Sequence, residues 1–466
     1  MALAEVRRLK TMKKLFIPSI FTLLFLAFEA NAQDAEEKPY VWPTDEAVLE
    51  KLDAWRDLKF GVLFHWGIYS VPGIVESWSL CSDDSPWHQR PEGTDYEDYK
   101  NWYFALNEAF YPRNFDPVGW AEIMADAGMK YMLFTSKHHD GFCMYYSKYT
   151  DYSIAKGPFR KHPQNNVGLH VAEAFRAQGF WTGWYFSMID WHNEWFWHPS
   201  YAAGTAKQNY RKDRHPDWWK NYLDFAVNQM DELTTDYGQV DIMWLDAAGW
   251  VQGDEYDLDG FLSGARERNP GMLCIERGVG GKNENYQTPE LRIPETQLDY
   301  PWESCIMLTN YWSWHPVQSY KSSRTLLNML IEIVAKGGSL VLGVGPTGDG
   351  EIEEEAVARL REIGLWLQSY GKAIYGTRNA EIYNDGNTWF TASKDGETLY
   401  AIYALEEGEV LPTEIEWTGN VPEGKIFEIK SGKSVKFEVL GERVKLTLPK
   451  GLADGPVAFE FSSKKQ

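Results

Sequence analysis

The sequence predicts a (β/α)8-like barrel of parallel strands followed by a small antiparallel β-sandwich. Short apolar runs alternate with amphipathic helical segments over about 330 residues, the pattern of a parallel sheet with helical crossovers. That length and number of strands suit a closed barrel better than an open doubly wound sheet. Near Gly376 the pattern changes to strict apolar–polar alternation with Asp-Gly, Ser-Gly and Leu-Gly turns, which is typical of antiparallel strands.

The expected elements follow in chain order. The barrel strands are predicted at 60–64, 131–135, 181–186, 240–245, 273–276 and 339–343. The helices are predicted at 117–127, 167–177, 218–237, 322–336 and 353–369. The C-terminal strands are predicted at 387–393, 398–404, 425–429, 434–439, 444–448 and 457–461. We therefore expect a catalytic domain at 33–378 and a β-sandwich at 379–466.

Composition excludes some partners and favours another. A net charge of -21 argues against nucleic acid and anionic membranes as partners and indicates a solubilising acidic surface. The 22 Trp and 26 Tyr exceed what a core needs. Aromatic rings beside polar residues can stack on sugar faces, although packing inside a large barrel is the alternative. The tryptophans concerned are Trp66, Trp184, Trp191, Trp195 and Trp197.

The N-terminus predicts export. Lys13 and Lys14 precede an apolar run at 15–28, and Ala30-Asn-Ala32 fits a cleavage site, so residues 1–32 are expected to be a signal peptide. The mature protein would be periplasmic or extracellular, without a membrane contact, and 34–43 would be an extended arm. The four cysteines are too few for a disulfide scaffold, and one or two bridges are left open.

The most informative segment follows the second predicted strand. The apolar run from Tyr131 ends in Lys137, His138, His139, Asp140 and Gly141. Functional side chains collect where buried parallel strands end. Adjacent side chains of a strand point to opposite faces and seldom share one metal ion. Hydrogen bonding to a polyhydroxylated substrate is therefore favoured over a metal site and over a structural histidine pair.

Other predicted strands also end in polar residues. They are His65, then Tyr185, Ser187, Asp190 and His192, then Trp244 and Asp246. A carboxylate after an apolar strand must be paired or functional, because burying an isolated charge is costly. Asp246 is the best nucleophile candidate, and capping the next helix is its alternative role. No phosphate-binding glycine motif follows the first strand, so nucleotide binding has no support.

Several motifs carry a specific family resemblance. They are Lys59-Phe-Gly-Val-Leu-Phe-His-Trp-Gly, Lys137-His-His-Asp-Gly-Phe, Asp241-Ile-Met-Trp-Leu-Asp, Trp302-Glu-Ser-Cys, Lys336-Gly-Gly-Ser-Leu-Val-Leu-Gly-Val-Gly-Pro and Leu360-Arg-Glu-Ile-Gly-Leu-Trp. In this order they resemble the α-L-fucosidases of glycoside hydrolase family 29. The resemblance implies a retaining exo-α-L-fucosidase that acts on fucosylated oligosaccharides or glycoconjugates and needs no metal or cofactor.

The resemblance also implies site residues. His65, His138, His139, Tyr185, Trp244 and Arg277 would line the fucose pocket, Trp78 would lie under the C5-methyl side, and Asp246 would be the nucleophile. Ser77 departs from the family's usual Glu, so a contact to the axial hydroxyl would be lost or taken over by Glu76. Ser339 and Gly343 replace two usual Asn, which we expect to affect only loop geometry.

Four glutamates are candidates for the acid/base. Glu276, Glu290, Glu295 and Glu303 all follow Asp246 in the chain. Glu290 lies on a long loop that could fold over the barrel mouth, and we favour it over Glu303. Two alternatives to a fucosidase remain: a related exo-glycosidase such as an α-L-galactosidase, and a non-catalytic glycan-binding protein. The presence of Asp246 and the histidines argues against the second. Linkage preference and oligomeric state are left open.

Overall fold

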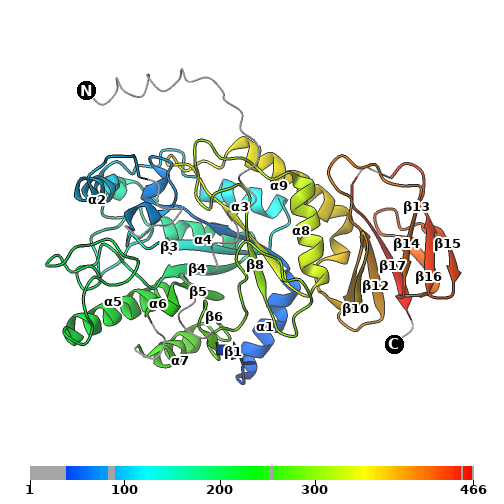
Figure 1. Cartoon of the computed structure of the whole chain (residues 1–466), viewed down its shortest axis with the longest axis horizontal. Coiled ribbons are helices and arrows are strands. Elements are labelled where there is room, and N and C mark those ends of the chain that lie inside the picture. The colour runs from blue at the N-terminus through cyan, green and yellow to red at the C-terminus, as the bar shows by residue number, and fades with distance from the viewer. Residues whose placement is uncertain (1–37, 82–89, 252–255, 453–454, 464–466) are drawn as a thin grey trace, which may run out of the picture. The chain divides into compact units, whose positions relative to one another are not determined.

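The computed structural model describes residues 38–81, 90–251, 256–452 and 455–463, so the expected signal peptide at 1–32 lies outside the described residues. Seven parallel strands form the barrel sheet in the order β6-β5-β4-β3-β2-β9-β8 (Figure 1). Their bounds are β2 (Phe60–Phe64), β3 (Tyr131–Lys137), β4 (Trp181–Ser187), β5 (Ile242–Asp246), β6 (Leu273–Glu276), β8 (Glu303–Met307) and β9 (Ser339–Val344). The six strands that the sequence predicts coincide with six of these seven, and β8 is the one not predicted.

Residues 284–290, which form no regular strand, fill the place between β6 and β8 in the barrel wall. Glu284 forms an antiparallel bridge with Ile275, and Glu290 forms a parallel bridge with Cys305. The Cys305 N–H also donates to the Pro289 carbonyl at 3.1 Å. The chain at 284–290 therefore acts as the missing wall of the barrel, and it brings Glu290 to the wall as it does so.

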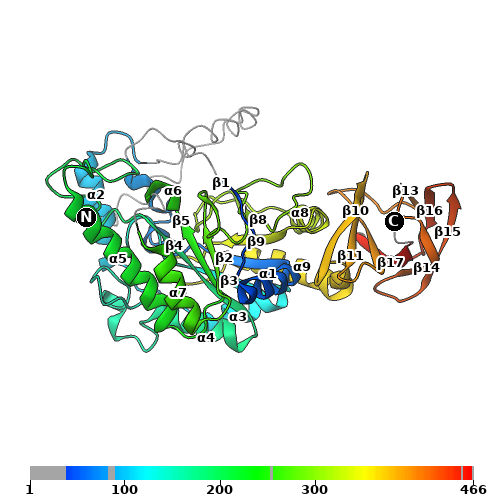
Figure 2. The same ribbon diagram turned by 90° about the horizontal axis from the view of Figure 1, so that it is seen from below.

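Helices cover the outer side of the strands, with α3, α4 and α7 visible there in Figure 2. The helices are α1 (Glu46–Leu58), α2 (Tyr96–Phe104), α3 (Pro117–Asp126), α4 (Val167–Ala177), α5 (Pro216–Thr235), α6 (Ala248–Val251), α7 (Leu258–Arg268), α8 (Ser323–Ala335) and α9 (Glu354–Tyr370). Several begin at a side chain that accepts an unpaired N–H of the first turn. Asp45 caps α1, Asp116 caps α3 and Ser322 caps α8. The five predicted helices match α3, α4, α5, α8 and α9.

The C-terminal strands form one antiparallel sheet in the order β10-β11-β12-β17-β14-β15-β16-β13. Their bounds are β10 (Thr377–Asp385), β11 (Thr388–Ser393), β12 (Thr398–Tyr403), β13 (Glu414–Thr418), β14 (Pro422–Glu428), β15 (Ser434–Leu440), β16 (Arg443–Thr447) and β17 (Val457–Ser463). The two outer strands meet where the Thr418 N–H donates to Asp385 at 2.6 Å, so the sheet is nearly closed. The domain boundary at 378 remains a proposal, and β10 begins one residue before it.

Most of the tryptophans that could have stacked on sugars are packed inside the protein. Trp66 is 0% exposed, Trp184 and Trp191 are each 2% exposed, and Trp197 is 6% exposed. Packing in a large barrel is therefore the role of these four. All four cysteines are buried and none of them forms a disulfide bond, so neither of the bridges left open by the sequence exists in the structure.

Gly61 of β2 allows the Tyr131 ring to cross the barrel interior. A Cβ at Gly61 would lie 2.4 Å from the Tyr131 ring, whose hydroxyl donates to Glu303 at 2.6 Å. Because this ring is held, we expect Gly61→Ala to lower the free energy of unfolding by about 1–3 kcal/mol through overpacking. Thermal unfolding followed by circular dichroism measures the effect.

Gly264 of α7 provides the matched control. Its nearest neighbour beyond the helix backbone is the Arg268 side chain, 3.8 Å from an added Cβ, so Gly264→Ala makes only an ordinary van der Waals contact. Alanine is better than glycine inside a helix by about 0.5–1 kcal/mol, so this variant should melt at or above the wild-type temperature. Equal losses in both variants would contradict the overpacking argument.

Candidate active site

The carboxyl ends of four neighbouring strands gather the predicted site residues at one mouth of the barrel. His65 follows β2, His138 and His139 follow β3, Tyr185 lies near the end of β4, and Asp246 ends β5. The ring centres of His65 and His138 are 5.7 Å apart, and those of His138 and His139 are 4.1 Å apart. The structure therefore brings these residues together as the strand pattern predicts.

Asp246 is held as a carboxylate by its neighbours. Its Oδ2 accepts a hydrogen bond of 2.5 Å from the Tyr185 hydroxyl, and its Oδ1 accepts one of 2.8 Å from Arg277. Burial opposes ionisation, but Arg277, His139 and these hydrogen bonds outweigh it and lower the pKa of Asp246 to about 2. Asp246 is thus charged and oriented at neutral pH, which is what a carboxylate nucleophile needs.

Arg277 connects two carboxylates. It follows β6, its Nη1 binds Asp246, and its Nη2 forms an ion pair with Glu290. The guanidinium also lies over the Trp244 ring, 5.1 Å from its centre. The wall segment at 284–290 therefore brings Glu290 onto the same cation as Asp246, although the two residues lie far apart in the sequence.

The three histidines of the pocket are uncharged at neutral pH. Burial lowers the pKa of His65 to about 3 and that of His139 to about 4, and it holds the pKa of His138 well below its usual value. A neutral imidazole offers one donor and one acceptor, which suits sugar hydroxyls. Trp78 closes the same side of the pocket, with its ring centre 4.8 Å from that of His139.

Glu303 occupies a different place from Glu290. It is the first residue of β8, is 0% exposed, and accepts hydrogen bonds from Tyr131 at 2.6 Å and from Trp244 at 3.3 Å. Tyr131 is the first residue of β3, so Glu303 lies toward the amino ends of the parallel strands, away from the mouth. Burial raises the pKa of Glu303 to about 8. The Glu290 side chain, by contrast, is 33% exposed.

Backbone strain marks two positions beside these carboxylates. Among the described residues, four that are not glycine have positive φ, and two of them are Ala247 (56°) and Leu291 (54°). They directly follow Asp246 and Glu290. Such conformations cost of order 1–3 kcal/mol each and tend to persist at functional sites.

Ser77 and its neighbour Glu76, where the sequence departs from the family pattern, both make buried hydrogen bonds. Ser77 Oγ lies 2.5 Å from His138 Nδ1, and Glu76 accepts the Ser313 N–H at 2.7 Å. The expectation that Ser339 and Gly343 affect loop geometry is wrong, because both lie within β9. A Cβ at Gly343 would lie 2.5 Å from the Trp312 ring, so this glycine leaves space for Trp312.

Two further aromatic residues belong to the site and were not predicted. Trp312 packs 5.2 Å from the His65 ring, and Trp250 of α6 lies edge-on to Trp78 at 5.8 Å. Trp250 could have been inferred from its position four residues after Asp246. Trp312 lies in the connection after β8. Because β8 was not predicted as a strand, the place of Trp312 in the site could be found only from the structure.

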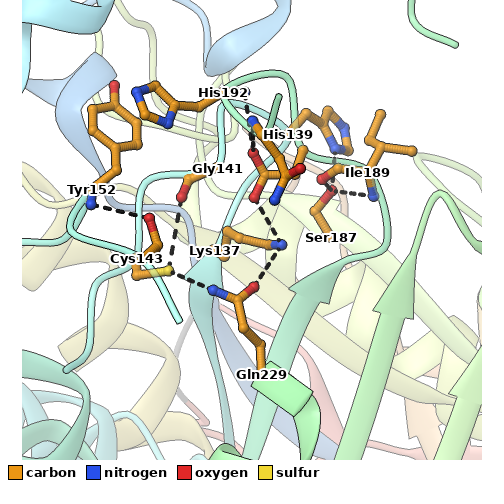
Figure 3. Close-up of polar contacts among 12 residues, drawn as sticks. Lys137, His139, Gly141, Cys143, Tyr152, Ser187, Ile189, His192 and Gln229 are labelled. Carbon is orange, nitrogen blue, oxygen red and sulfur yellow. Dashed lines mark hydrogen bonds and ion pairs between the residues drawn. The ribbon is translucent and has the colours of Figure 1, made fainter. Parts of the chain in front are cut away.

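A buried polar cluster lies beside His139 (Figure 3). Lys137 Nζ is 3.2 Å from Asp190 and 2.9 Å from the Gln229 side-chain oxygen, and the Lys137 side chain is 0% exposed. The Trp191 N–H donates to the His139 carbonyl at 2.8 Å. These bonds join the chain after β4 to the chain after β3, so His139 sits on a rigid support.

Two classes of feature are absent from the described residues. No group of three or more His, Cys, Asp or Glu side chains there is arranged to hold a metal ion. No helix in the same residues is long and apolar enough to cross a membrane.

The chain matches known proteins over most of its length. The family model for α-L-fucosidase matches residues 27–372. Plasma α-L-fucosidase of Rattus norvegicus is 27% identical, over 89% of this chain and 94% of the relative. Tissue α-L-fucosidase of Homo sapiens is 28% identical, over 83% of each chain.

Solved structures agree with this match. α-L-Fucosidase isoenzyme 1 from Paenibacillus thiaminolyticus superposes with a TM-score of 0.75 and 28% identity, covering 90% of this chain and 100% of the other. The Thermotoga maritima α-fucosidase in complex with fucose gives a TM-score of 0.72 and 28% identity, covering 91% and 100%. The barrel, the C-terminal sheet and these matches show that the chain belongs to the α-L-fucosidase family, glycoside hydrolase family 29.

Proposed function

We propose that this protein is an exported, retaining exo-α-L-fucosidase that hydrolyses terminal α-L-fucose from glycans. The observation that carries the proposal is the pair of carboxylates, Asp246 and Glu290, bound to the two nitrogens of Arg277. Retaining glycosidases need two carboxyl groups about 5–5.5 Å apart, one as nucleophile and one as acid and then base. Two carboxylates on one guanidinium are suited to that arrangement.

The charges of this group stay balanced through both steps. In the first step Glu290 gives its proton to the glycosidic oxygen while Asp246 attacks the anomeric carbon and forms a β-linked ester. Asp246 then carries no charge, and the Glu290 carboxylate takes its place as the single anion facing Arg277. In the second step Glu290 removes a proton from water, which attacks the ester and releases the sugar with its original α configuration.

Glu303 has another role in this proposal. Its buried position and raised pKa favour a neutral carboxyl group that accepts hydrogen bonds from Tyr131 and Trp244. Trp244 stacks on Tyr185, with ring centres 5.3 Å apart, and Tyr185 donates to Asp246. Glu303 is therefore a positioning residue that acts on Asp246 through two aromatic side chains.

The pocket and the N-terminus support the remaining parts of the proposal. The neutral histidines suit an uncharged sugar, and Trp78 and Trp312 present apolar surface to its carbon skeleton. The enclosed position of Asp246, whose side chain is 14% exposed, favours a terminal sugar over an internal one. Export rests on the sequence pattern at 13–32 alone.

The serine at position 77 favours considering a second substrate. Ser77 is much smaller than the glutamate usual in the family, so a sugar of the same stereochemistry with an added C6 hydroxyl, α-L-galactose, is the alternative substrate. A panel of 4-nitrophenyl glycosides distinguishes the two. Faster hydrolysis of the α-L-galactoside than of the α-L-fucoside would reverse the assignment.

Replacing the nucleophile tests the centre of the proposal. Asp246→Asn should lose several decades of kcat on 4-nitrophenyl α-L-fucoside, because no glycosyl ester can form. The fold should persist, since Arg277 keeps Glu290 as its partner. Asp259→Asn on the exposed face of α7 is the control and should keep full activity. Activity of Asp246→Asn within about tenfold of wild type, roughly 1.4 kcal/mol of barrier, would reject the role of Asp246.

Chemical rescue separates the two glutamates. Glu290→Ala should form the covalent intermediate from an activated aryl α-L-fucoside and then accumulate it, because a good leaving group needs little protonation. Azide needs no general base, so it should accelerate turnover and yield α-L-fucosyl azide after two inversions. Product analysis by NMR reads the configuration.

Glu303→Gln is the matched variant for this experiment. In this variant the amide oxygen can still accept from Trp244, while the amide nitrogen can donate to the Tyr131 oxygen, whose own proton can turn to the Leu340 carbonyl, so this enzyme should keep most of its activity and should not respond to azide. If azide rescues a Glu303 variant and leaves Glu290→Ala unchanged, the two roles are the reverse of those proposed.

A further inference from the structure

The hydrogen bonds around Ser187 determine which nitrogen of His139 carries the proton. Ser187 ends β4 and is 0% exposed. Its Oγ lies 2.8 Å from the Ile189 carbonyl oxygen and 3.2 Å from the Ile189 N–H, and His139 Nδ1 lies 2.8 Å away (Figure 3). A serine hydroxyl has one proton to donate and can accept two hydrogen bonds.

Only one arrangement of protons satisfies all three contacts. The backbone N–H can only donate and the carbonyl can only accept, so the Ser187 proton goes to the Ile189 carbonyl. His139 Nδ1 must then donate its proton to Ser187. If Ser187 instead donated its proton to His139 Nδ1, the buried Ile189 carbonyl would lose its donor. Leaving a buried acceptor without a partner costs about 1–3 kcal/mol.

The other nitrogen of His139 consequently has a free lone pair at the reaction centre. His139 is uncharged at neutral pH because burial lowers its pKa to about 4. Its Nε2 lies 3.8 Å from Asp246 Oδ2, too far for a direct hydrogen bond. Two acceptors thus face each other across a short gap, and such a gap is complementary to a hydroxyl group that donates.

We propose that Ser187 is a positioning residue that locks His139 in the tautomer protonated at Nδ1, so that Nε2 accepts a hydrogen bond from the substrate hydroxyl next to the anomeric carbon. The identity of the hydroxyl rests on the proposed function, in which Asp246 attacks the anomeric carbon. Without Ser187 the imidazole can move its proton to Nε2, on the side that faces Asp246. That change removes the acceptor for the substrate hydroxyl.

The tautomer can be measured in the wild-type protein without any sugar. In protein labelled with 15N-histidine, the His139 signals, assigned by their loss in His139→Asn, should show a proton on Nδ1 and none on Nε2 at neutral pH. A proton on Nε2 would overturn the inference. This measurement needs no activity, so its outcome is independent of the proposed function.

The binding of two sugars tests whether His139 Nε2 accepts a hydrogen bond from this hydroxyl. Wild-type protein should bind L-fucose about tenfold more tightly than 2-deoxy-L-fucose, the value of one net hydrogen bond. In Ser187→Ala this ratio should fall to about threefold or less, and the tautomer signal of His139 should shift toward Nε2 protonation. An unchanged ratio in Ser187→Ala would refute the role of Ser187.

Ser153→Ala is the matched control. Ser153 is also buried, donates to a carbonyl at 2.6 Å and accepts the N–H of the second residue after it at 3.2 Å, but contacts no histidine. It should lose stability as Ser187→Ala does and keep the tenfold ratio. Equal loss of the ratio in both variants would make the effect merely structural. If wild-type protein neither binds L-fucose nor hydrolyses α-L-fucosides, the proposed function fails, while the tautomer result stands by itself.

Discussion

The site depends on one guanidinium that serves two carboxylates. Arg277 holds Asp246 at 2.8 Å through one nitrogen and pairs with Glu290 through the other. Buried charges are tolerated only when they are paired, and here one cation faces two anions. In the double displacement proposed above, Asp246 and Glu290 act in turn beside this one cation.

The barrel wall is what makes this pairing possible. A regular strand between β6 and β8 would present side chains alternately to the interior and the exterior, at fixed heights. The segment at 284–290 instead makes isolated bridges, antiparallel with β6 and parallel with β8. This irregular course, which ends in the strained Leu291, places Glu290 beside a cation that follows β6. In the proposed function, the regular strands supply the nucleophile and the sugar-binding residues, and the irregular segment supplies the acid.

The elements that could be predicted from sequence are those whose pattern is local. Strand β2 is an uninterrupted apolar run, and residues at its end follow from strand geometry. Strand β8 escaped prediction because it begins with Glu303 and a serine, which resemble a loop until the Tyr131 and Trp244 partners are known. Strand β10 escaped because few of its side chains are buried. The role of Gly343 depends on Trp312 packing across it, a contact between distant segments that no local pattern contains.

The absence of disulfide bonds among the four cysteines has a consequence for where this protein can be made. Burial raises the pKa of Cys143 to about 12 and also raises the pKa values of the Cys274 and Cys305 thiols, so none of these three is a ready nucleophile or oxidation target. The described fold contains no covalent cross-link that an oxidising compartment would have to supply. Removal of residues 1–32 should therefore leave a polypeptide able to mature in the reducing cytosol of an expression host, without isomerases or refolding.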